Sequence, residues 1–136
     1  MIKSFKNKKE VFIYLIKKFI LNEGTILLRG SMINEPVKDF CDFDLEIYTN
    51  KKLKPYYEIV FVNKKICLIS IWFGKYRIGS QSKMPKKVKL IHGNYFSYMK
   101  GLSDKRSDSQ HVIDWVFKYI RTKNMERLDW INKKIN

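Results

Sequence analysis

The first periodic stretch of the chain predicts an amphipathic helix over about residues 8 to 22. Its apolar side chains recur at spacings of three and four residues, as one face of a helix requires: Val11, Phe12, Leu15, Ile16, Phe19 and Ile20. Asn7 and Glu10 have the spacing of a capping box at the helix start, and Gly24 provides a stop signal after it. We therefore expect a helix near the N-terminus that buries one apolar face.

Two strands are predicted in the next part of the chain. Residues 25 to 28 form a short apolar run that ends at Gly30 and Ser31. After a segment interrupted by Pro36, apolar residues alternate with acidic ones over residues 42 to 47, which is the period of a strand. The acidic side chains of this second strand should therefore share one face, opposite to its apolar side chains.

Further strands are predicted in the middle of the chain, and helices at its end. Runs rich in β-forming residues, 57 to 62 and 66 to 73, flank residues 63 to 65 and indicate a hairpin. Glycine and proline interrupt the following segment, in which residues 88 to 91 are one more candidate strand. From about residue 107 to 136 the apolar spacing predicts two successive helices. These elements predict an α+β fold with a mixed sheet, an N-terminal helix and C-terminal helices.

Length and composition favour one basic globular domain over residues 1 to 136. The chain has 28 Lys and Arg against 13 Asp and Glu, a net charge of +15, and 45% of its residues are hydrophobic. This apolar content argues against a disordered tail and against a disulfide-stapled miniprotein. No apolar run is long enough to span a bilayer and no signal-peptide cleavage site is evident, so we expect a cytoplasmic protein without a membrane partner. Cys41 and Cys67 lack a CxxC spacing or a nearby histidine, which favours buried reduced thiols over a zinc site.

The distribution of charge is more informative than the net charge. The basic residues are mostly lysine and the chain has no alanine, a composition that an AT-rich genome imposes whatever the function. Residues 59 to 103 contain nine Lys or Arg and no acidic residue, whereas residues 35 to 46 contain five of the thirteen acidic residues. One basic cluster follows the predicted hairpin: Lys83, Lys86, Lys87 and Lys89. A solvated loop explains this cluster better than contact with phosphates, so the acidic segment is the better guide to chemistry.

Asp42 and Asp44 stand two residues apart on the second predicted strand, so their side chains lie on one face about 6.5–7 Å apart. Two carboxylates held together repel each other unless a cation neutralises them, and carboxylate oxygens suit Mg²⁺. Upstream, Gly30 and Ser31 leave a strand for a turn, where free backbone N–H groups and a hydroxyl suit phosphate oxygens. A phosphate cradle beside metal-binding carboxylates indicates phosphoryl or nucleotidyl transfer.

These residues carry a resemblance. A strand, Gly30-Ser31, a ten-residue spacer and the strand beginning Asp42-Phe43-Asp44 resemble the signature of the nucleotidyltransferase superfamily that includes DNA polymerase beta. The spacing and the short chain are similar to the minimal nucleotidyltransferases of bacteria and archaea. The wider group of nucleotidyltransferase-like proteins includes aminoglycoside adenylyltransferases and some antitoxins. The signature that carries the resemblance spans residues 25 to 48.

The resemblance implies a Mg²⁺-dependent transfer of a nucleoside monophosphate from an NTP, with ATP favoured, to a hydroxyl of a protein, an RNA end or a small molecule. Asp42 and Asp44 would bind two Mg²⁺ ions, and Gly30 and Ser31 would hold the triphosphate. Related proteins usually carry a third catalytic carboxylate on a neighbouring strand. Here Ser70 occupies the comparable place. Glu58 is then the nearest substitute, and Glu46 is less favoured because we expect it toward the far end of its strand.

Two other classes of function stay open. The first is a catalytically degenerate nucleotidyltransferase-fold module that binds a partner, as an antitoxin does, because the third carboxylate is replaced. The second is a nucleic-acid-binding domain that uses the basic stretch between residues 64 and 100.

Overall fold

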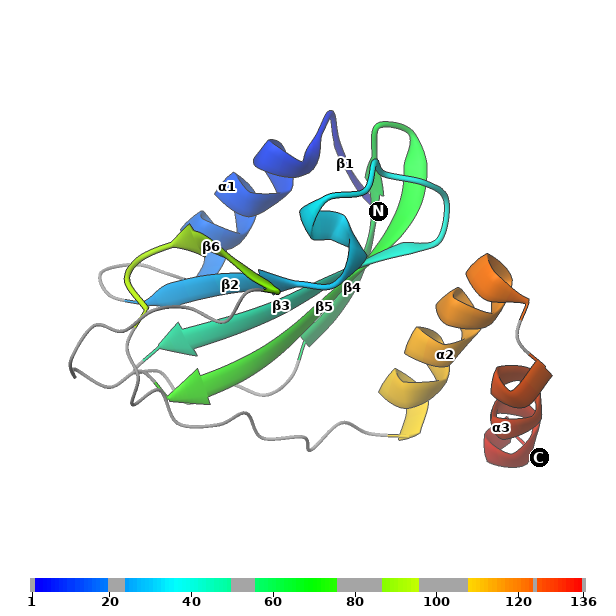
Figure 1. Ribbon diagram of the computed structural model, residues 1–136. Coiled ribbons are helices and arrows are strands. Elements are labelled where there is room, and N and C mark those ends of the chain that lie inside the picture. The colour runs from blue at the N-terminus through cyan, green and yellow to red at the C-terminus, as the bar shows by residue number, and fades with distance from the viewer. Residues whose placement is uncertain are drawn as a thin grey trace.

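The computed structural model describes residues 2–19, 24–49, 56–75, 87–95, 108–123 and 125–135. The helices in these stretches are α1 (Lys8–Phe19), α2 (Asp108–Thr122) and α3 (Met125–Ile135), with a one-turn 3-10 helix, η1 (Ser31–Ile33). The strands are β1 (Lys3–Phe5), β2 (Thr25–Arg29), β3 (Cys41–Thr49), β4 (Tyr56–Val62), β5 (Lys65–Lys75) and β6 (Val88–His92). Figure 1 shows their arrangement.

The described strands form one six-stranded sheet in the order β1-β4-β5-β3-β2-β6. β3 runs parallel to β5, and β1 runs parallel to β4, whereas the other neighbouring strands are antiparallel. The predicted α+β fold with a mixed sheet and helices at both ends is therefore confirmed. The candidate strand at residues 88 to 91 is confirmed as β6, while β1 was not predicted.

α1 begins as its sequence predicts. The side chain of Asn7 accepts a hydrogen bond from the backbone N–H of Glu10 at 3.0 Å, and the Glu10 carboxylate accepts one from the backbone N–H of Lys6 at 2.8 Å. These two bonds satisfy N–H groups that a helix start leaves without partners. The helix ends at Phe19, and the last predicted helical positions, from residue 20 on, lie outside the described residues.

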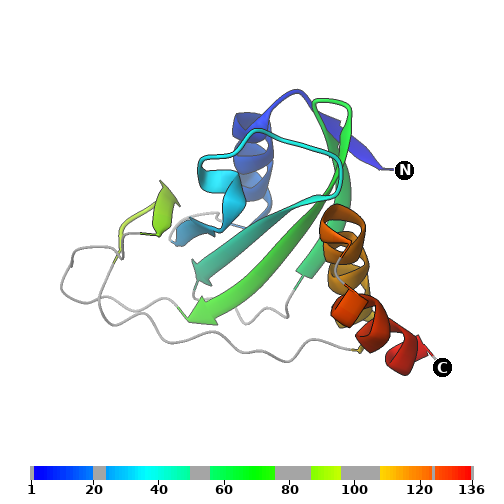
Figure 2. The ribbon, with the colours of Figure 1, turned by 45° about the vertical axis from the view of Figure 1, so that its right-hand side comes forward.

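The main core lies between α1 and one face of the sheet. Val11 and Leu15 of α1 are fully buried there. The sheet contributes alternate residues of its central strands, including Ile26, Leu28, Phe43, Leu45, Ile47, Ile69 and Ile71. Burial of each such side chain stabilises the fold by about 1.5–3 kcal/mol. Figures 1 and 2 show α1 on this side of the sheet, whereas α2 and α3 lie on the other side.

The predicted hairpin is β4 and β5, joined by a two-residue turn. Asn63 and Lys64 have φ values of 50° and 62°, and a type I′ turn requires positive φ at both central positions. Val62 is therefore paired with Lys65, and the same register pairs Glu58 with Ile69. This turn decides which face of the sheet each β4 side chain occupies.

Both cysteines are buried and neither is in a disulfide. Cys41 of β3 is paired in register with Cys67 of β5, and burial raises the pKa of the Cys67 thiol to about 12. The prediction of buried thiols is confirmed. In the part of the chain that the structure describes, no helix has the length and apolar character needed to cross a membrane.

Candidate functional site

The acidic residues of β3 form a row on one face of the sheet. Asp42, Asp44 and Glu46 alternate with side chains that belong to the core against α1, so they point to the opposite face. Asp42 and Glu46 are buried, at 7% and 6% exposure, and Asp44 is half-buried. Asp42 and Asp44 therefore share a face, as the alternation of the sequence predicts.

A polar row crosses the sheet at Asp44. The register places Asp44 opposite Arg29 of β2 on one side and opposite Ser70 of β5 on the other, and Ser70 is opposite Tyr57 of β4. Ser70 is buried at 1% exposure. The sequence prediction that Ser70 occupies the place beside the aspartates is confirmed by this register.

Gly30 lies beside Asp44. Its φ is 82°, in the region that favours glycine, and a Cβ at this position would stand 3.9 Å from Asp44 Oδ2. The chain then turns into η1, in which the backbone N–H of Ile33 donates to the Gly30 carbonyl at 3.3 Å. Lys8 of α1 fixes this turn because its Nζ donates to the Met32 carbonyl at 2.8 Å. The structure thus brings the predicted Gly-Ser turn to the predicted Asp-x-Asp strand.

A cavity of about 420 Å³ lies between β3 and α2. Its lining residues are Arg29, Asp44, Leu45, Glu46, Trp72, Asp114 and Lys118. Cavities of this volume accommodate small molecules and cofactors. Of the residues singled out from the sequence, Asp44 and Glu46 line the cavity. Outside its lining lie Gly30, Ser31, Asp42, Glu58 and Ser70.

Ion pairs neutralise the acidic groups around this cavity. Arg121 of α2 binds Asp42 Oδ1 through Nη1, and Arg29 binds Glu46 Oε2 through Nε. Lys118 Nζ lies 2.9 Å from Asp114 Oδ2, one turn away on α2. The hydrogen bond to Glu46 raises the pKa of Arg29 above its ordinary value, more than burial lowers it. The face therefore combines carboxylates with cations that belong to the protein itself.

Glu46 lies closer to the site than its sequence position suggested. β3 continues to Thr49, so Glu46 is in the middle of the strand, next to Asp44 on the same face. Besides Arg29, its carboxylate accepts a hydrogen bond from the Tyr48 hydroxyl at 3.1 Å. The pKa of Tyr48 is raised, chiefly by burial and then by the charge of Glu46. Glu46 is thus held by two partners within the cavity wall.

Glu58 lies on the other face of the sheet, which corrects the expectation that it joins the aspartates. Its register partner, Ile69, belongs to the core against α1. The physical reason is the turn of the hairpin. A three-residue turn over residues 63 to 65 would have placed Glu58 opposite Ser70, but the two-residue turn shifts the register by one residue and reverses the face.

The carboxylate of Glu58 is engaged where it lies. It accepts hydrogen bonds from the hydroxyls of Tyr14, at 2.8 Å, and Tyr56, at 2.7 Å. Lys3 and Lys18 lie 3.7 and 3.9 Å away. Burial alone would raise the pKa of Glu58, but the two tyrosine hydrogen bonds and the two lysines together lower it. This cluster ties α1 to β4.

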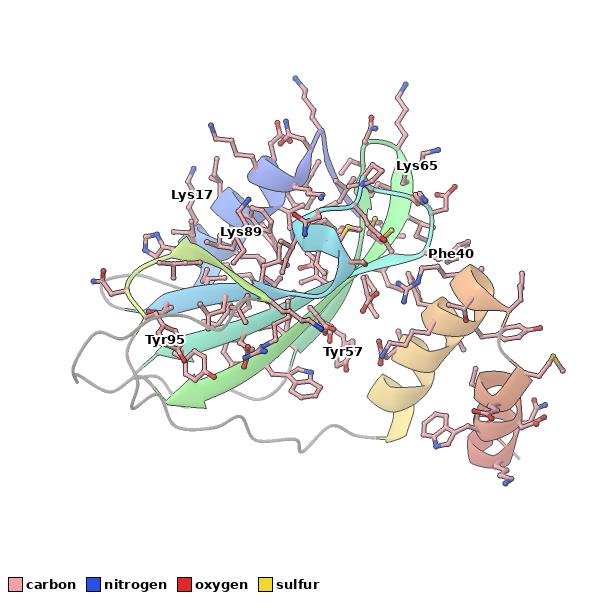
Figure 3. All side chains as sticks on the ribbon, viewed as in Figure 1. Lys17, Phe40, Tyr57, Lys65, Lys89 and Tyr95 are labelled. Carbon is pink, nitrogen blue, oxygen red and sulfur yellow. The ribbon has the colours of Figure 1, made fainter. Side chains whose placement is uncertain are left out.

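Sequence reasoning missed the residues that α2 contributes. Asp114, Lys118 and Arg121 follow one another at spacings of four and three, the spacing of one helix face, and Asp114 is only 4% exposed. This polar stripe is the available sequence signal, but the strand that it faces depends on tertiary packing. Figure 3 shows Phe40, which directly precedes β3, close to the C-terminal end of α2. The Phe40 ring packs edge-to-face on the ring of Phe117 of α2, with the two ring centroids 5.6 Å apart.

The basic cluster after the hairpin is only partly described. Lys87 and Lys89 are exposed, and Lys89 belongs to the edge strand β6. Lys83 and Lys86 lie outside the described residues. The two described lysines fit the solvated surface expected from the sequence.

Asp42 and Asp44 are chemically suited to Mg²⁺. Among the described residues there is no group of three or more His, Cys, Asp or Glu side chains arranged for a metal ion. Mg²⁺ is commonly held by one or two carboxylates together with water and substrate phosphates, so a pair of aspartates on one strand face fits this ion. Because Arg121 is paired with Asp42 Oδ1, it would compete with a metal ion for this carboxylate.

Comparison of the chain with protein-family models, curated proteins and solved structures found no match.

Proposed function

We propose that this protein is a Mg²⁺-dependent nucleotidyltransferase that moves a nucleoside monophosphate from an NTP to a hydroxyl acceptor. The observation that carries the proposal is the position of Gly30 beside Asp44, where an added Cβ would reach the carboxylate, on the sheet face that also carries Asp42. It joins a turn suited to phosphate with a pair of carboxylates suited to Mg²⁺. The adjoining cavity of about 420 Å³ has the volume of a small-molecule site.

Each residue has a defined role in this proposal. Asp42 and Asp44 would hold Mg²⁺, which when bound orients the α-phosphate and offsets negative charge on the leaving pyrophosphate. Gly30 admits phosphate close to the backbone because it has no side chain, and Ser31 offers a hydroxyl. ATP is the first NTP to test.

The transfer also needs a group that accepts the proton of the attacking hydroxyl. The hydroxyl oxygen bonds to the α-phosphorus, the bond from that phosphorus to the bridging oxygen breaks, and pyrophosphate leaves. Ser70 is not a base, and Glu58 lies on the other face. Asp114 is a buried carboxylate that lines the same cavity as Asp44. We assign the proton to Asp114, whose carboxylate is positioned by Lys118 Nζ at 2.9 Å.

Transfer of label from α-labelled NTPs to candidate protein, RNA and small-molecule acceptors tests this proposal. Wild type should transfer label with Mg²⁺, and Asp42→Asn and Asp44→Asn should abolish transfer. Asp114→Asn should lower transfer by about 100-fold while Mg²⁺-dependent ATP binding persists. Glu35→Gln removes an exposed carboxylate of the spacer and is the matched control. Absence of both transfer and Mg²⁺-dependent ATP binding in wild type would contradict the proposal.

A catalytically degenerate binding module is the second candidate. Two observations favour it. The ion pair with Arg121 engages the proposed metal ligand Asp42, and Ser70 stands beside Asp44 where a third carboxylate was expected. A module of this kind, such as an antitoxin, would form a stable complex with its protein or RNA partner. That complex would survive Asp42→Asn and Asp44→Asn, and the free protein would bind no ATP in the presence of Mg²⁺.

A further inference from the structure

Arg121 is the cation that the fold supplies to Asp42. It extends from the last turn of α2, and its Nη1 binds Asp42 Oδ1 and lies 3.4 Å from the Phe40 carbonyl oxygen. The Asp42 side chain is 8% exposed and the Arg121 side chain 29%. A carboxylate so little exposed needs a counter-cation, because an uncompensated buried charge is strongly destabilising. In this state Arg121 is that counter-cation.

A divalent cation at Asp42 would compete with Arg121. The guanidinium engages Oδ1, one of the two carboxylate oxygens that can bind a metal ion, and two positive groups at one carboxylate repel each other. Binding of the metal at Asp42 is therefore stronger when the Arg121 side chain moves away. Its partial exposure leaves space on the solvent side for that movement.

α2 itself is fixed to the sheet independently of this ion pair. Phe117, at 6% exposure, packs on the ring of Phe40. Phe40 has a φ of 64°, an unfavourable conformation for a bulky residue, and its N–H donates to the Ile66 carbonyl at 2.7 Å. The helix is thus anchored one turn before Arg121, so the side chain can change partner while the helix stays in place.

The new partner of Arg121 would be a phosphate group. Lys118 precedes Arg121 by three residues, which places both cations on the same side of α2, and Lys118 lines the cavity with Asp44. A guanidinium matches phosphate oxygens with two parallel hydrogen bonds, and an NTP carries several negative charges along its phosphates. Phosphates bound beside Asp44 would lie near Lys118, and Arg121 follows one turn later on the same side of α2.

We propose that Arg121 exchanges partners during nucleotide binding, an inference that rests on the proposed function. Arg121 neutralises Asp42 in the free protein, and it moves to the phosphates of a nucleoside triphosphate when a divalent cation occupies Asp42. Arg121 is then a positioning residue that opposes metal binding without nucleotide and favours nucleotide binding with metal. Its removal should change these two affinities in opposite directions.

The test measures both affinities in Arg121→Met, which keeps the apolar stem of the side chain and removes its charge. Mn²⁺ binding without nucleotide, followed by electron paramagnetic resonance, should tighten by about tenfold, and ATP binding at saturating Mn²⁺ should weaken by about tenfold. Lys133→Met, which removes an exposed charge from α3, is the matched control and should leave both affinities within about twofold of wild type. Damage to the fold would weaken both affinities together, and that result would overturn the inference.

Arg121→Lys covers the case in which Arg121→Met does not fold. It keeps a charge at Asp42 but loses the paired hydrogen bonds to phosphate, so ATP binding should weaken several-fold while Mn²⁺ binding stays near that of wild type. Unchanged ATP binding would count against the exchange.

The Asp42→Asn variant separates the two proposals. If Mn²⁺ binding depends on Asp42 but Arg121 variants change neither affinity, the exchange is wrong and the proposed function stands. If neither wild type nor Arg121→Met binds Mn²⁺, both are wrong.

Discussion

Individual charged residues have different roles on the two faces of the sheet. On the face toward α2, the ion pair of Asp42 with Arg121 lies at the candidate metal position, and we propose that it opens. On the face toward α1, the carboxylate of Glu58 is held by two tyrosine hydroxyls and two lysines, and none of these residues lines the cavity of the proposed site. In our proposal, the same type of side chain serves chemistry in one place and stability in the other.

The lowered pKa of Glu58 predicts a pH-dependent contribution to stability. Because the pKa in the folded state lies below the ordinary value of 4.5, the contribution is fully present at pH values above 4.5 and is lost as the pH falls through the folded-state pKa. Glu58→Gln should lower the free energy of unfolding by about 1–2 kcal/mol at pH 7, and this difference from wild type should shrink in acid.

Urea unfolding of both proteins at neutral and acidic pH would measure this change. Glu35→Gln, which alters an exposed carboxylate, is the control. A difference between wild type and Glu58→Gln that stays constant with pH would show that the cluster does not stabilise the charged form of Glu58.

At the scale of elements, α2 completes the site that the sheet begins. β2 and β3 bring Gly30 to Asp44, and α2 adds Asp114, Lys118 and Arg121 across the cavity. α2 also packs on α3, where Ile131 is buried. The packing of Phe117 on Phe40 therefore holds the α2 residues of the site against the sheet.

Phe117→Ala should detach α2 from the sheet before it unfolds the sheet. Loss of a buried aromatic side chain costs about 3–5 kcal/mol, and Phe117 packs on Phe40, directly before β3. Hydrogen exchange should show reduced protection in α2 and α3, with little change in β3 and β5. Phe117→Leu should restore part of the protection, and equal loss of protection in the sheet and the helices would contradict this role.

The elements differ in how far their sequences determine them. The periods of α1, β3 and the C-terminal helices come from local burial of one face, so these elements could be predicted. The sheet face of Glu58 could not be predicted, because it depends on whether the turn between β4 and β5 has two or three residues. The approach of Arg121 to Asp42 joins residues 79 positions apart, and only tertiary packing brings them together.

For the whole molecule, the few acidic residues indicate function more specifically than the many basic ones. The net charge of +15 is spread mainly over lysines, whereas the row on β3 places three acidic side chains on one largely buried face. Excess positive charge raises the encounter rate with an anionic nucleotide and is screened by salt. The acidic row on β3 and the cations of α2 would then provide the binding contacts for the nucleotide and its metal ion.

The central claim is that Asp42 and Asp44, beside Gly30, form a Mg²⁺-dependent nucleotide site. Isothermal titration of ATP into wild type, Asp44→Asn and Glu35→Gln, each with and without Mg²⁺, tests it most directly. We predict that wild type and Glu35→Gln bind ATP only with Mg²⁺ and that Asp44→Asn binds at least about tenfold more weakly, a difference of about 1.4 kcal/mol. ATP binding that is absent in wild type, or equal in Asp44→Asn and wild type, would contradict the claim.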